Sequence, residues 1–400
     1  MSPAGGIAVI LLAAGRSSRM GTSKLLLPLG AVSAIERLIG SVSQAKVDDI
    51  VVVTGHDADR ITPVLDRLPV RRVHNARYES GMFSSVRTGV EALTDGVEAF
   101  LVLPADLPLV RTEVLDRLIE GFRESGREIL HPSCCGLRGH PPLVAGRYID
   151  PLLQADGWCS LQDFFRVYHE AEVELEVEDL SILMDMDNEE DYRRMSRFAR
   201  FLDATANTAA EAGTGPPDAG NGALSPEDAL YLLSVLEVPD LVVRHCQTVA
   251  TAGEALAEAL KPHVPSLDVG LVRAAGLLHD MARPKPRHAI VAQNLLASLG
   301  LSRLGAVVGA HMVLPAEQLD TPVVTEEQLV YLADKLVIED RIAGLEQRAA
   351  RALSRRGQDP TAVEGVRRKI RAAQIIQERV ETILQRPLDE VLLREIPPSI

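Results

Sequence analysis

The hydrophobic pattern of the chain changes at about residue 200, and this change limits what the chain can fold into. Before it, short β-branched runs such as IAVILLAAG, DDIVVVTG and EAFLVLPADLP alternate with amphipathic stretches. Such alternation predicts a mostly parallel sheet flanked by helices. After it, apolar residues recur almost only at helical spacing. We therefore expect an α/β Rossmann-like domain followed by an all-α helical domain.

The segment between the two patterns, residues 203–222, reads DATANTAAEAGTGPPDAGNG. It has no apolar period and is rich in Ala, Gly, Pro and Thr, which predicts a flexible linker. Directly after it, Ser225 and Pro226 are typical of an N-cap and a first helical position. Four segments are therefore expected: 1–202, 203–222, 223–345 and 346–400. Two roles stay open for the last one, which are packing on the helical bundle and forming a homodimer interface.

Composition narrows the classes of partner. A formal net charge of −14 argues against a nucleic-acid binder, because phosphate backbones require clustered Lys and Arg. The longest apolar run, residues 7–14, is far shorter than a membrane span and leads into a Gly/Ser/Arg loop instead of a cleavage site. We therefore expect a cytoplasmic protein without a membrane partner. The four cysteines have no zinc spacing and are expected to be free thiols.

The first predicted strand runs directly into a loop of small residues, 13–24. Ligands of α/β proteins bind at the carboxyl edge of the parallel sheet, which is where this loop must lie. Small side chains let backbone N–H groups approach phosphate oxygens, while Arg19 and Lys24 can neutralise a triphosphate. The loop is neither a Walker A sequence nor a dinucleotide fingerprint, so a tight turn with solvated cations stays open as the alternative.

The whole string LLAAGRSSRMGTSKLLLPLG resembles the signature of the MobA-like nucleotidyltransferases, in particular the molybdenum cofactor cytidylyltransferases. The resemblance covers about residues 5–200 and continues, in order, through the segments 79–87, 103–108, 138–141 and 185–191. It implies a reaction in which a terminal phosphate of molybdopterin attacks the α-phosphate of CTP and expels pyrophosphate. In such a reaction the protein contributes positioning and charge stabilisation. GTP as the nucleotide, or a sugar phosphate as the acceptor, stays open as the alternative.

The same resemblance implies roles for particular residues. It makes residues 79–87 the loop that contacts base and ribose, and it places the nucleotide on Leu12, Ala13, Ala14, Gly15, Arg19, Lys24, Ser80, Gly81, Ser84 and Ser85. It places the acceptor on Arg138, Gly139 and His140, and it makes Arg19, Lys24 and Asp106 catalytic. The second alanine of the Ala13-Ala14-Gly15 run favours cytidine over guanosine by analogy with the family.

Acidic residues complete the expected first site. Asp106 follows a buried strand and is flanked by prolines, which presents its carboxylate rigidly at the sheet edge. Mg²⁺ binds one or two carboxylates together with substrate phosphates, so Asp187 and Asp185 are candidates for the second ligand. The sequence leaves the choice between these two open. A turn-capping carboxylate is the alternative interpretation of Asp106.

Histidines and aspartates fall on apolar helix faces in the second half of the chain. They are His245, His279, Asp280, His288, His311 and Asp334. Burying such groups costs several kcal/mol unless they are paired, and a shared metal removes that cost. Taken singly, each histidine is more simply a hydrogen-bonded core residue, but five converging helices favour a metal site. Imidazoles and carboxylates without thiolate suit Fe, Mn, Zn, Ni or Mg, and the histidines favour the transition metals.

The motifs LLHD at residues 277–280 and YLADK at residues 331–335 resemble those of HD-domain phosphohydrolases with extra histidines between the HD pair and the final aspartate. The resemblance covers about residues 225–345. It implies that the six residues bind divalent metal, and that Asp280 bridges two ions that activate water against a phosphate ester. A metal-bound regulatory sensor without turnover stays open as the alternative. The leading expectation is a bifunctional enzyme, a Mg²⁺-dependent nucleotidyltransferase joined to an HD phosphohydrolase.

Overall fold

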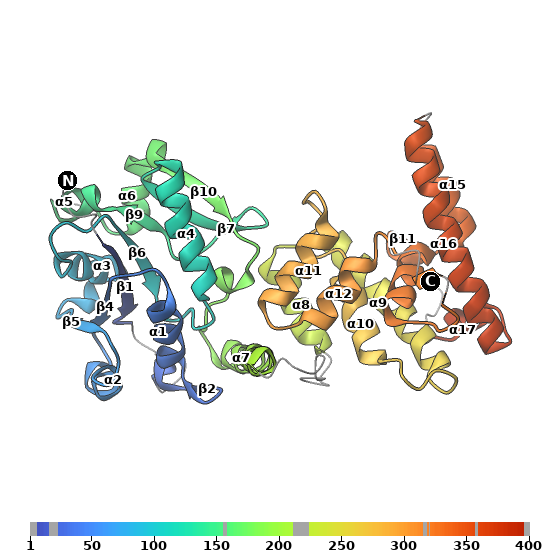
Figure 1. The fold of residues 1–400 in the computed structure, drawn as a ribbon, viewed down its shortest axis with the longest axis horizontal. Coiled ribbons are helices and arrows are strands. Elements are labelled where there is room, and N and C mark those ends of the chain that lie inside the picture. Colours follow the sequence, from blue (N-terminus) through green and yellow to red (C-terminus); the bar gives the residue numbers. More distant parts are fainter. Residues whose placement is uncertain are drawn as a thin grey trace. The chain divides into compact units, whose positions relative to one another are not determined.

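The computed structural model divides into two compact units, Met1–Gly213 and Thr214–Ile400 (Figure 1). It describes residues 6–15, 23–154, 158–210, 224–314, 318–319, 321–356 and 359–395. Among the described helices, none combines the length and the apolar character needed to cross a membrane.

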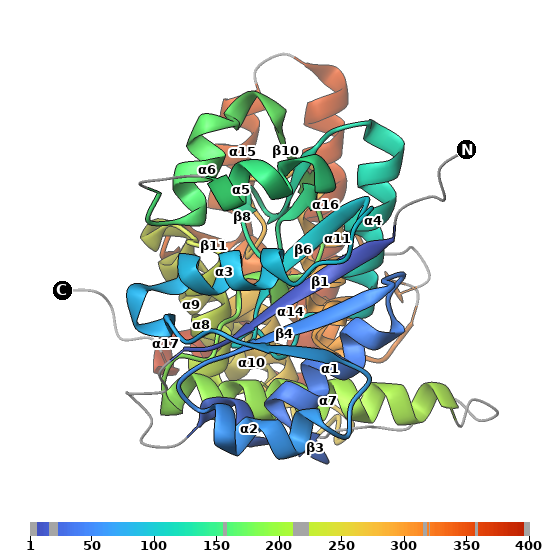
Figure 2. The same ribbon diagram turned by 90° about the vertical axis from the view of Figure 1, so that its left-hand side faces the viewer.

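The first unit is built on an eight-stranded sheet with the order β10-β7-β9-β6-β1-β4-β5, to which β8 is added beside β7. The strands are β1 (Ile7–Ala13), β4 (Asp49–Thr54), β5 (Arg71–His74), β6 (Ala99–Pro104), β7 (Ile129–Cys134), β8 (Leu137–Arg138), β9 (Leu143–Ala145) and β10 (Glu172–Glu176). Figure 2 shows β1 between β6 and β4, and both pairs are parallel. Strand β9 is antiparallel to β6 and β7, so the sheet is mixed but mostly parallel, as predicted.

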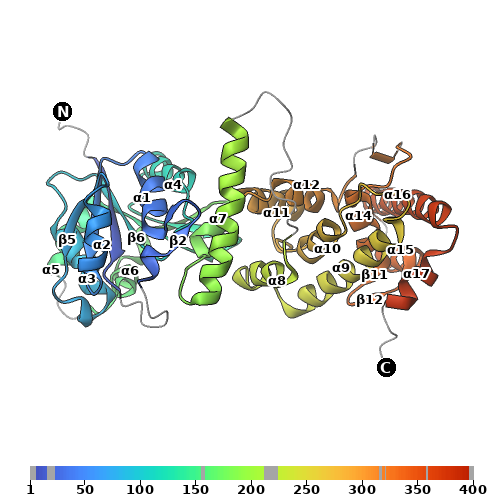
Figure 3. The ribbon, with the colours of Figure 1, turned by 90° about the horizontal axis from the view of Figure 1, so that it is seen from below.

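Helices cover both faces of this sheet, which explains why its central strands are continuously apolar. The helices are α1 (Ala34–Gln44), α2 (Ala58–Leu65), α3 (Met82–Glu91), α4 (Thr112–Ser125), α5 (Ile149–Gln154), α6 (Leu161–Val167) and α7 (Glu189–Ala210). Helix α3 packs on β1 and α5, while α1 packs beside α4, and Figure 3 shows these two pairs on opposite sides of the sheet. Residues of β6 such as Phe100 and Leu101 are fully buried between the two layers.

The segment after Gly30 forms a defined entry into α1. A short hairpin of β2 (Pro28–Leu29) and β3 (Val32–Ser33) leads into the helix. Ser33 then forms a capping box with Glu36, because each side chain accepts a hydrogen bond from the other residue's backbone N–H.

Helix α7 continues into the segment that was expected to be a linker. The prediction that the linker begins at residue 203 is wrong, because residues 203–210 are helical. Arg37 of α1 holds this part of the helix, with its Nη2 2.6 and 2.7 Å from the two carboxylate oxygens of Asp203. The alanines of the segment favour helix, and the lack of an apolar period does not prevent one that is docked in this way. Residues 211–223 lie outside the described residues.

The second unit is a helical bundle. Its helices are α8 (Pro226–Val235), α9 (Asp240–Leu260), α10 (Val269–Leu278), α11 (His288–Ser298), α12 (Ser302–Ala310), α14 (Glu326–Leu336), α15 (Gly344–Arg356), α16 (Pro360–Leu384) and α17 (Leu388–Glu395). Ser225 caps α8 as predicted, by accepting a hydrogen bond from the backbone N–H of Asp228. The all-α expectation needs one small correction, because β11 (Val337–Ile338) and β12 (Arg341–Ile342) form a hairpin.

The C-terminal helices belong to the same compact unit as the bundle. Helix α16 packs against α14 and α9, and it buries Ala373, Ile376 and Val380. Packing on the bundle, the first of the two roles left open for residues 346–400, is therefore observed. A homodimer interface stays a prediction.

Helices α9 and α10 approach each other closely at Gly276. A Cβ at this position would lie 2.6 Å from the Cα and 2.9 Å from the N of Ala250. Because these are backbone atoms, they cannot give way unless one helix shifts. We expect Gly276→Ala to lower the free energy of unfolding by about 1–3 kcal/mol. Urea denaturation, with amide hydrogen exchange of α9 and α10 as the probe, measures the loss.

Gly365 offers a matched control in the interior of α16. An added Cβ there meets no atom within 4 Å. Gly365→Ala should therefore raise the free energy of unfolding by about 0.4–1 kcal/mol, because alanine loses less backbone entropy in a helix. If the two substitutions changed stability equally, the close approach at Gly276 would not be a constraint on this fold.

Candidate functional sites

The first site lies where β1 and β6 end side by side at the carboxyl edge of the sheet. Leu12 is opposite Pro104 in the register, and the backbone N–H of Ala105 donates to the carbonyl of Leu12. Asp106 follows immediately. Its carbonyl accepts a hydrogen bond of 2.9 Å from the backbone N–H of Met186, which brings the distant 185–187 segment beside it. A single backbone bond thus sets two acidic segments next to each other.

Lys24 joins these two segments. Its Nζ lies 3.0 Å from Oδ2 of Asp106 and 3.1 Å from Oδ1 of Asp187. Burial by itself would lower the pKa of Lys24, but the two carboxylates outweigh it and raise that pKa above its ordinary value. The structure therefore brings three predicted residues together, with the positive charge of Lys24 between the carboxylates of Asp106 and Asp187.

Asp185 takes a different position from Asp187. The residue is exposed overall, but partial desolvation of its carboxyl group, together with the negative charges of Asp187 and Asp106, raises its pKa. The geometry favours Asp187 as the residue that shares a cation with Asp106, while Asp185 adds to the negative field around them. The choice that the sequence left open stays a prediction, in which Asp187 is favoured by its distance to Lys24.

The small-residue loop lies at the same edge. Ala13 and Ala14 are buried, Leu12 is half-buried and Gly15 is exposed, and a Cβ added at Gly15 would meet no atom of the described residues within 4 Å. Contacts from Ala13 to Gly15 to a ligand would therefore come from the backbone, as the sequence suggested. Arg19 lies outside the described residues, as do the other residues from 16 to 22.

The segment predicted to contact base and ribose is held by Asn75, which the sequence pattern did not single out. Its Nδ2 lies 2.8 Å from Oγ of Ser84 and 3.0 Å from Oγ of Ser85, and its Oδ1 accepts from the backbone N–H of Arg77. Ser85 is buried, so its hydroxyl group bonds to Asn75 within the loop and does not face the solvent. Ser80 and Gly81 are exposed, and Gly81 has a φ of 101°, which allows α3 to start there. An asparagine directly after a strand is a turn signal that could have indicated this role.

The predicted acceptor loop is shaped by close backbone contacts. A Cβ on Gly139 would lie 2.6 Å from the carbonyl oxygen of Ile182, and the backbone N–H of His140 donates to that same oxygen at 3.0 Å. His140 is exposed and precedes a cis proline. Arg138 pairs with Glu172 and Glu174, so its charge is already balanced on β10.

The second site joins residues from five helical elements of the bundle. His245 is on α9, His279 and Asp280 follow α10 directly, His288 begins α11, His311 follows α12, and Asp334 is near the end of α14. All are buried except His288, whose side chain is 19% exposed. The structure therefore brings all six predicted residues together.

Backbone carbonyls fix the orientation of three of the imidazoles. Nδ1 of His245 lies 2.7 Å from the carbonyl of Glu339, in the turn of the β11–β12 hairpin. Nδ1 of His279 lies 2.8 Å from the carbonyl of Gly276, and Nδ1 of His311 lies 2.7 Å from that of Val308. Because a carbonyl only accepts, each Nδ1 must carry the proton, and each Nε2 presents a lone pair.

The last two carbonyls belong to helix ends. Gly276 and Val308 are in the final turns of α10 and α12, where carbonyls lack a partner within the helix. The rings of His279 and His311 therefore cap their own helices with Nδ1 while Nε2 points to the site.

Asp280 lies between two sets of nitrogen ligands. We call His245, His279 and Asp280 the inner group, and Asp280, His288 and His311 the outer group; the ligand atoms within each group all lie within 4.8 Å of one another. Oδ2 of Asp280 is 3.9 and 3.6 Å from Nε2 of His245 and His279. Oδ1 is 3.5 and 3.8 Å from Nε2 of His288 and His311. One carboxylate thus presents a different oxygen to each group.

The donor set fits divalent cations. Two ligands that share one ion at about 2.1 Å lie roughly 3.0–3.5 Å apart, close to the separations found here. Nε2 of His279 is buried, and it has no hydrogen-bond partner among the described residues. Nε2 of His288 lies 3.3 Å from Nε2 of His311, a separation that two ligands of one ion also have. These observations support metal binding at both groups.

Charges around the site favour the ligating forms of its residues. Burial lowers the pKa of His311 to about 3, and it lowers the pKa of His288 as well. Burial by itself would raise the pKa of Asp280, but His279 and Arg283 outweigh it and leave that pKa below its ordinary value. His288 and His311 are therefore neutral, and the carboxylate of Asp280 is ionised, at neutral pH.

Asp334 is attached to the edge of the inner group. Its Oδ1 lies 3.3 Å from Nε2 of His245 and 3.8 Å from Nε2 of His279. Its other oxygen is 2.5 Å from Nζ of Lys335, which also donates to the carbonyl of His311. Lys335 is buried, so it holds the ligands in place and is not a basic residue of the surface.

The buried state of His311 predicts a particular dependence of stability on pH. Its pKa is about 3 in the folded chain against an ordinary value of 6.5, so the unfolded chain takes up the proton first as the pH falls. Stability is therefore lost below pH 6.5. Between pH 7.5 and 5.5 the metal-free protein should lose about 1.4 kcal/mol on account of this residue. Denaturation of wild type and His311→Gln at both pH values measures the difference.

His263 is an exposed histidine of the same unit and serves as the control. His263→Gln should leave the pH dependence as it is in wild type. If His311→Gln also left it unchanged, His311 would titrate normally in the folded chain, and the proposed environment would be wrong.

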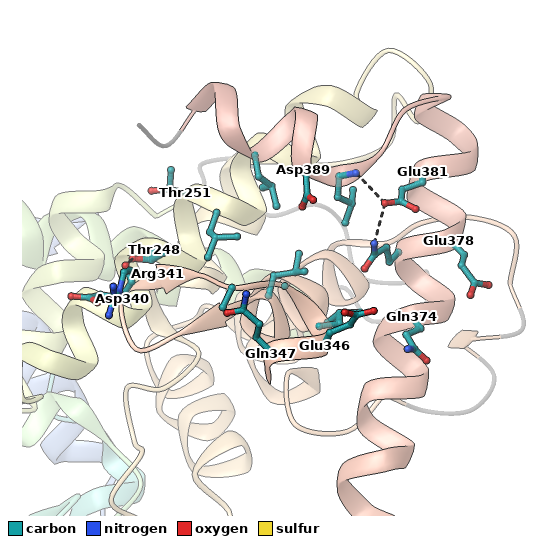
Figure 4. Close-up of a pocket in the computed structure, with 18 of the residues that line it drawn as sticks. Thr248, Thr251, Asp340, Arg341, Glu346, Gln347, Gln374, Glu378, Glu381 and Asp389 are labelled. Carbon is teal, nitrogen blue, oxygen red and sulfur yellow. Dashed lines mark hydrogen bonds between the residues drawn. The ribbon is translucent and has the colours of Figure 1, made fainter. Parts of the chain in front are cut away.

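A separate cavity of about 1080 Å³ opens in the same unit (Figure 4). It is lined by α9, α16, α17 and residues 340–347, with Thr248, Asp340 and Arg341 at one end and Gln374 and Glu378 at the other. None of the six predicted metal ligands lines it. The cavity is therefore distinct from the metal site, although His245 and Thr248 are on the same helix.

Fold and sites together describe a chain with a lysine and two aspartates at the carboxyl edge of an α/β sheet, and a helical unit whose histidines and aspartates could hold divalent metal. Residues 9–173 match the MobA-like NTP transferase domain, and residues 242–338 match the HD domain. The chain is therefore a fusion of a MobA-like NTP transferase domain and an HD domain, as its motifs predicted.

Relatives of known name match part of the chain. The chain is 34% identical over 127 residues to the bifunctional protein GlmU of Francisella tularensis subsp. novicida, and 29% identical over 125 residues to that of Synechococcus sp. (strain RCC307). Each match covers 31% of this chain and 27% or 28% of the relative, so the chain spans little more than a quarter of these proteins' length.

Solved structures also resemble the first domain. A nucleotidyl transferase from Methanothermobacter is 25% identical, with a TM-score of 0.42, over 48% of this chain and 97% of its own. A 4-diphosphocytidyl-2C-methyl-D-erythritol synthase from Anaerococcus prevotii is 17% identical, with a TM-score of 0.41, over 49% of this chain and 99% of its own.

Proposed function

We propose that the first unit transfers CMP from CTP to a terminal phosphate of molybdopterin, with release of pyrophosphate. The observation that carries this proposal is the convergence of Asp106, Asp187 and Lys24 beside a small-residue loop, within a MobA-like NTP transferase domain. The choice of CTP and molybdopterin rests on the likeness of the loop to that of the molybdenum cofactor cytidylyltransferases.

Each residue of this site would have its own role in the transfer. Asp106 and Asp187 both lie within 3.1 Å of one cationic nitrogen, so their oxygens fit one Mg²⁺. The ion would neutralise charge on the phosphates during transfer. Lys24 would bind a phosphate oxygen, the exposed backbone at Gly15 would approach the triphosphate, and Asn75 would hold the loop that contacts base and ribose.

We further propose that the second unit is a phosphohydrolase that uses two divalent transition-metal ions. Asp280 supports this proposal, because its two oxygens face two separate sets of imidazoles. A metal pair bound here supplies Lewis acidity toward water and a phosphate ester. The protein's own part is to hold three imidazoles in one tautomer and to keep Asp280 ionised with the help of Arg283, whose Nη1 lies 2.9 Å from it.

A pyrophosphate-release assay tests the first activity. CTP with molybdopterin is expected to give the fastest release, ahead of GTP and ahead of CTP with a panel of sugar phosphates. Release that is fastest with a sugar phosphate would replace the acceptor, and release that requires GTP would replace the nucleotide. For the second unit, metal content is measured together with hydrolysis of a panel of phosphate esters. Bound metal without any hydrolysis would favour a regulatory sensor.

A further inference from the structure

Lys24 occupies the position between the two carboxylates proposed as metal ligands. Its Nζ is within 3.1 Å of both Asp106 and Asp187, and its side chain is only 16% exposed. The residues beside it are anchored, because Ser23 and Leu25 are buried and the backbone N–H of Leu26 donates to the carbonyl of Ser23. The flexible lysine stem can therefore move its ammonium group while the backbone stays in place.

An ammonium and a metal ion cannot share these oxygens. Mg²⁺ would need them at about 2.0–2.1 Å, and a positive nitrogen about 3 Å from the same atoms would overlap with the ion and repel it. A free divalent cation must therefore displace Lys24 before it can bind. A triphosphate offers the ammonium group another strong anionic partner at the same sheet edge.

We propose that Lys24 is an internal counter-ion that prevents free divalent cations from binding to Asp106 and Asp187. A nucleoside triphosphate removes this obstacle by binding the ammonium group of Lys24. The inference rests on the proposed nucleotidyltransferase function of this site. It makes the binding of metal and nucleotide mutually dependent, because each removes an obstacle to the other. Metal then enters the site together with the nucleotide and not before it.

The experiment is a titration of the full-length protein with Mn²⁺ alone, followed by electron paramagnetic resonance, without nucleotide and with the HD domain already loaded with metal. Lys24→Met keeps the length of the side chain and removes its charge. We expect it to bind Mn²⁺ at least about 10-fold more tightly than wild type, because two carboxylates then face the solvent without their counter-ion. Lys24→Arg retains the charge and should bind as weakly as wild type.

The double variant Lys24→Met with Asp106→Asn assigns the gain to this site, because it should lose the tight binding again. Lys24→Met binding Mn²⁺ no more tightly than wild type would overturn the proposal, and so would a gain that survives Asp106→Asn. The titration contains no nucleotide or acceptor. An absence of transferase activity would therefore count against the proposed function, while the Mn²⁺ titration would still test the role of Lys24 as a counter-ion.

Discussion

Replacing Asp280 by asparagine is expected to empty both metal groups of the helical unit. Asp280 is the one residue common to the inner and outer groups, and it gives a separate oxygen to each. Asparagine keeps the size of the side chain but has no charge and only one oxygen. Loss of a partner residue behind a ligand already costs 10–100-fold in metal affinity, so loss of this ligand should cost at least about 100-fold at each group.

Single-ligand variants make the comparison quantitative. His245→Gln and His311→Gln each change one group, so each should remove one ion per chain and leave the other. Asp240→Asn changes an exposed carboxylate in the first turn of α9, which also carries His245, and should leave the metal content as it is in wild type. Metal analysis of the four proteins after identical purification gives the answer. Two ions retained in Asp280→Asn would show that this carboxylate is not shared.

The second large effect is expected at Asp106. Asp106→Asn removes the charge that faces Lys24 and the proposed Mg²⁺, and we expect pyrophosphate release to fall by at least about 10³-fold. The metal content of the HD domain should not change, because its ligands are all in the other unit. Steady-state release of pyrophosphate, with metal analysis of the same sample, measures both.

Asp95→Asn is the matched control for this variant. Asp95 is an exposed acid in the turn before β6, at the amino end of the strand whose carboxyl end leads to Asp106. The control variant should transfer nucleotide at the wild-type rate. An unchanged rate in Asp106→Asn would remove Asp106 from the metal site and leave the first proposal without its main support.

Much of the fold followed from hydrophobic periodicity, because that pattern depends mainly on which faces are buried. The apolar runs of β1, β4 and β6 and the helical spacing of the second half needed no other information. The start of the linker was predicted wrongly, since the contact between Arg37 and Asp203 joins residues that are far apart in sequence. A local pattern carries no sign of such a contact.

The two sites could be predicted from the sequence to different extents. Residue type and motif order were enough to select Lys24, Asp106 and the six residues of the HD domain. The observation that favours Asp187 over Asp185 is its distance of 3.1 Å to Nζ of Lys24, which only the fold reveals. Asn75 was not predicted, because it acts on the loop only through hydrogen bonds to Ser84 and Ser85 and carries no charge that would single it out in the sequence. Residues that position others are difficult to find in a sequence for this reason.

Two of the metal-site histidines also end the helices that precede them, and this ties coordination to helix length. The ring of His279 is fixed by the carbonyl of Gly276, and that of His311 by the carbonyl of Val308. One residue inserted ahead of either histidine would rotate its ring by about 100° around the helix axis and carry Nε2 out of reach of the ions. Among related chains, α10 and α12 should therefore tolerate substitution along their length far better than insertion or deletion.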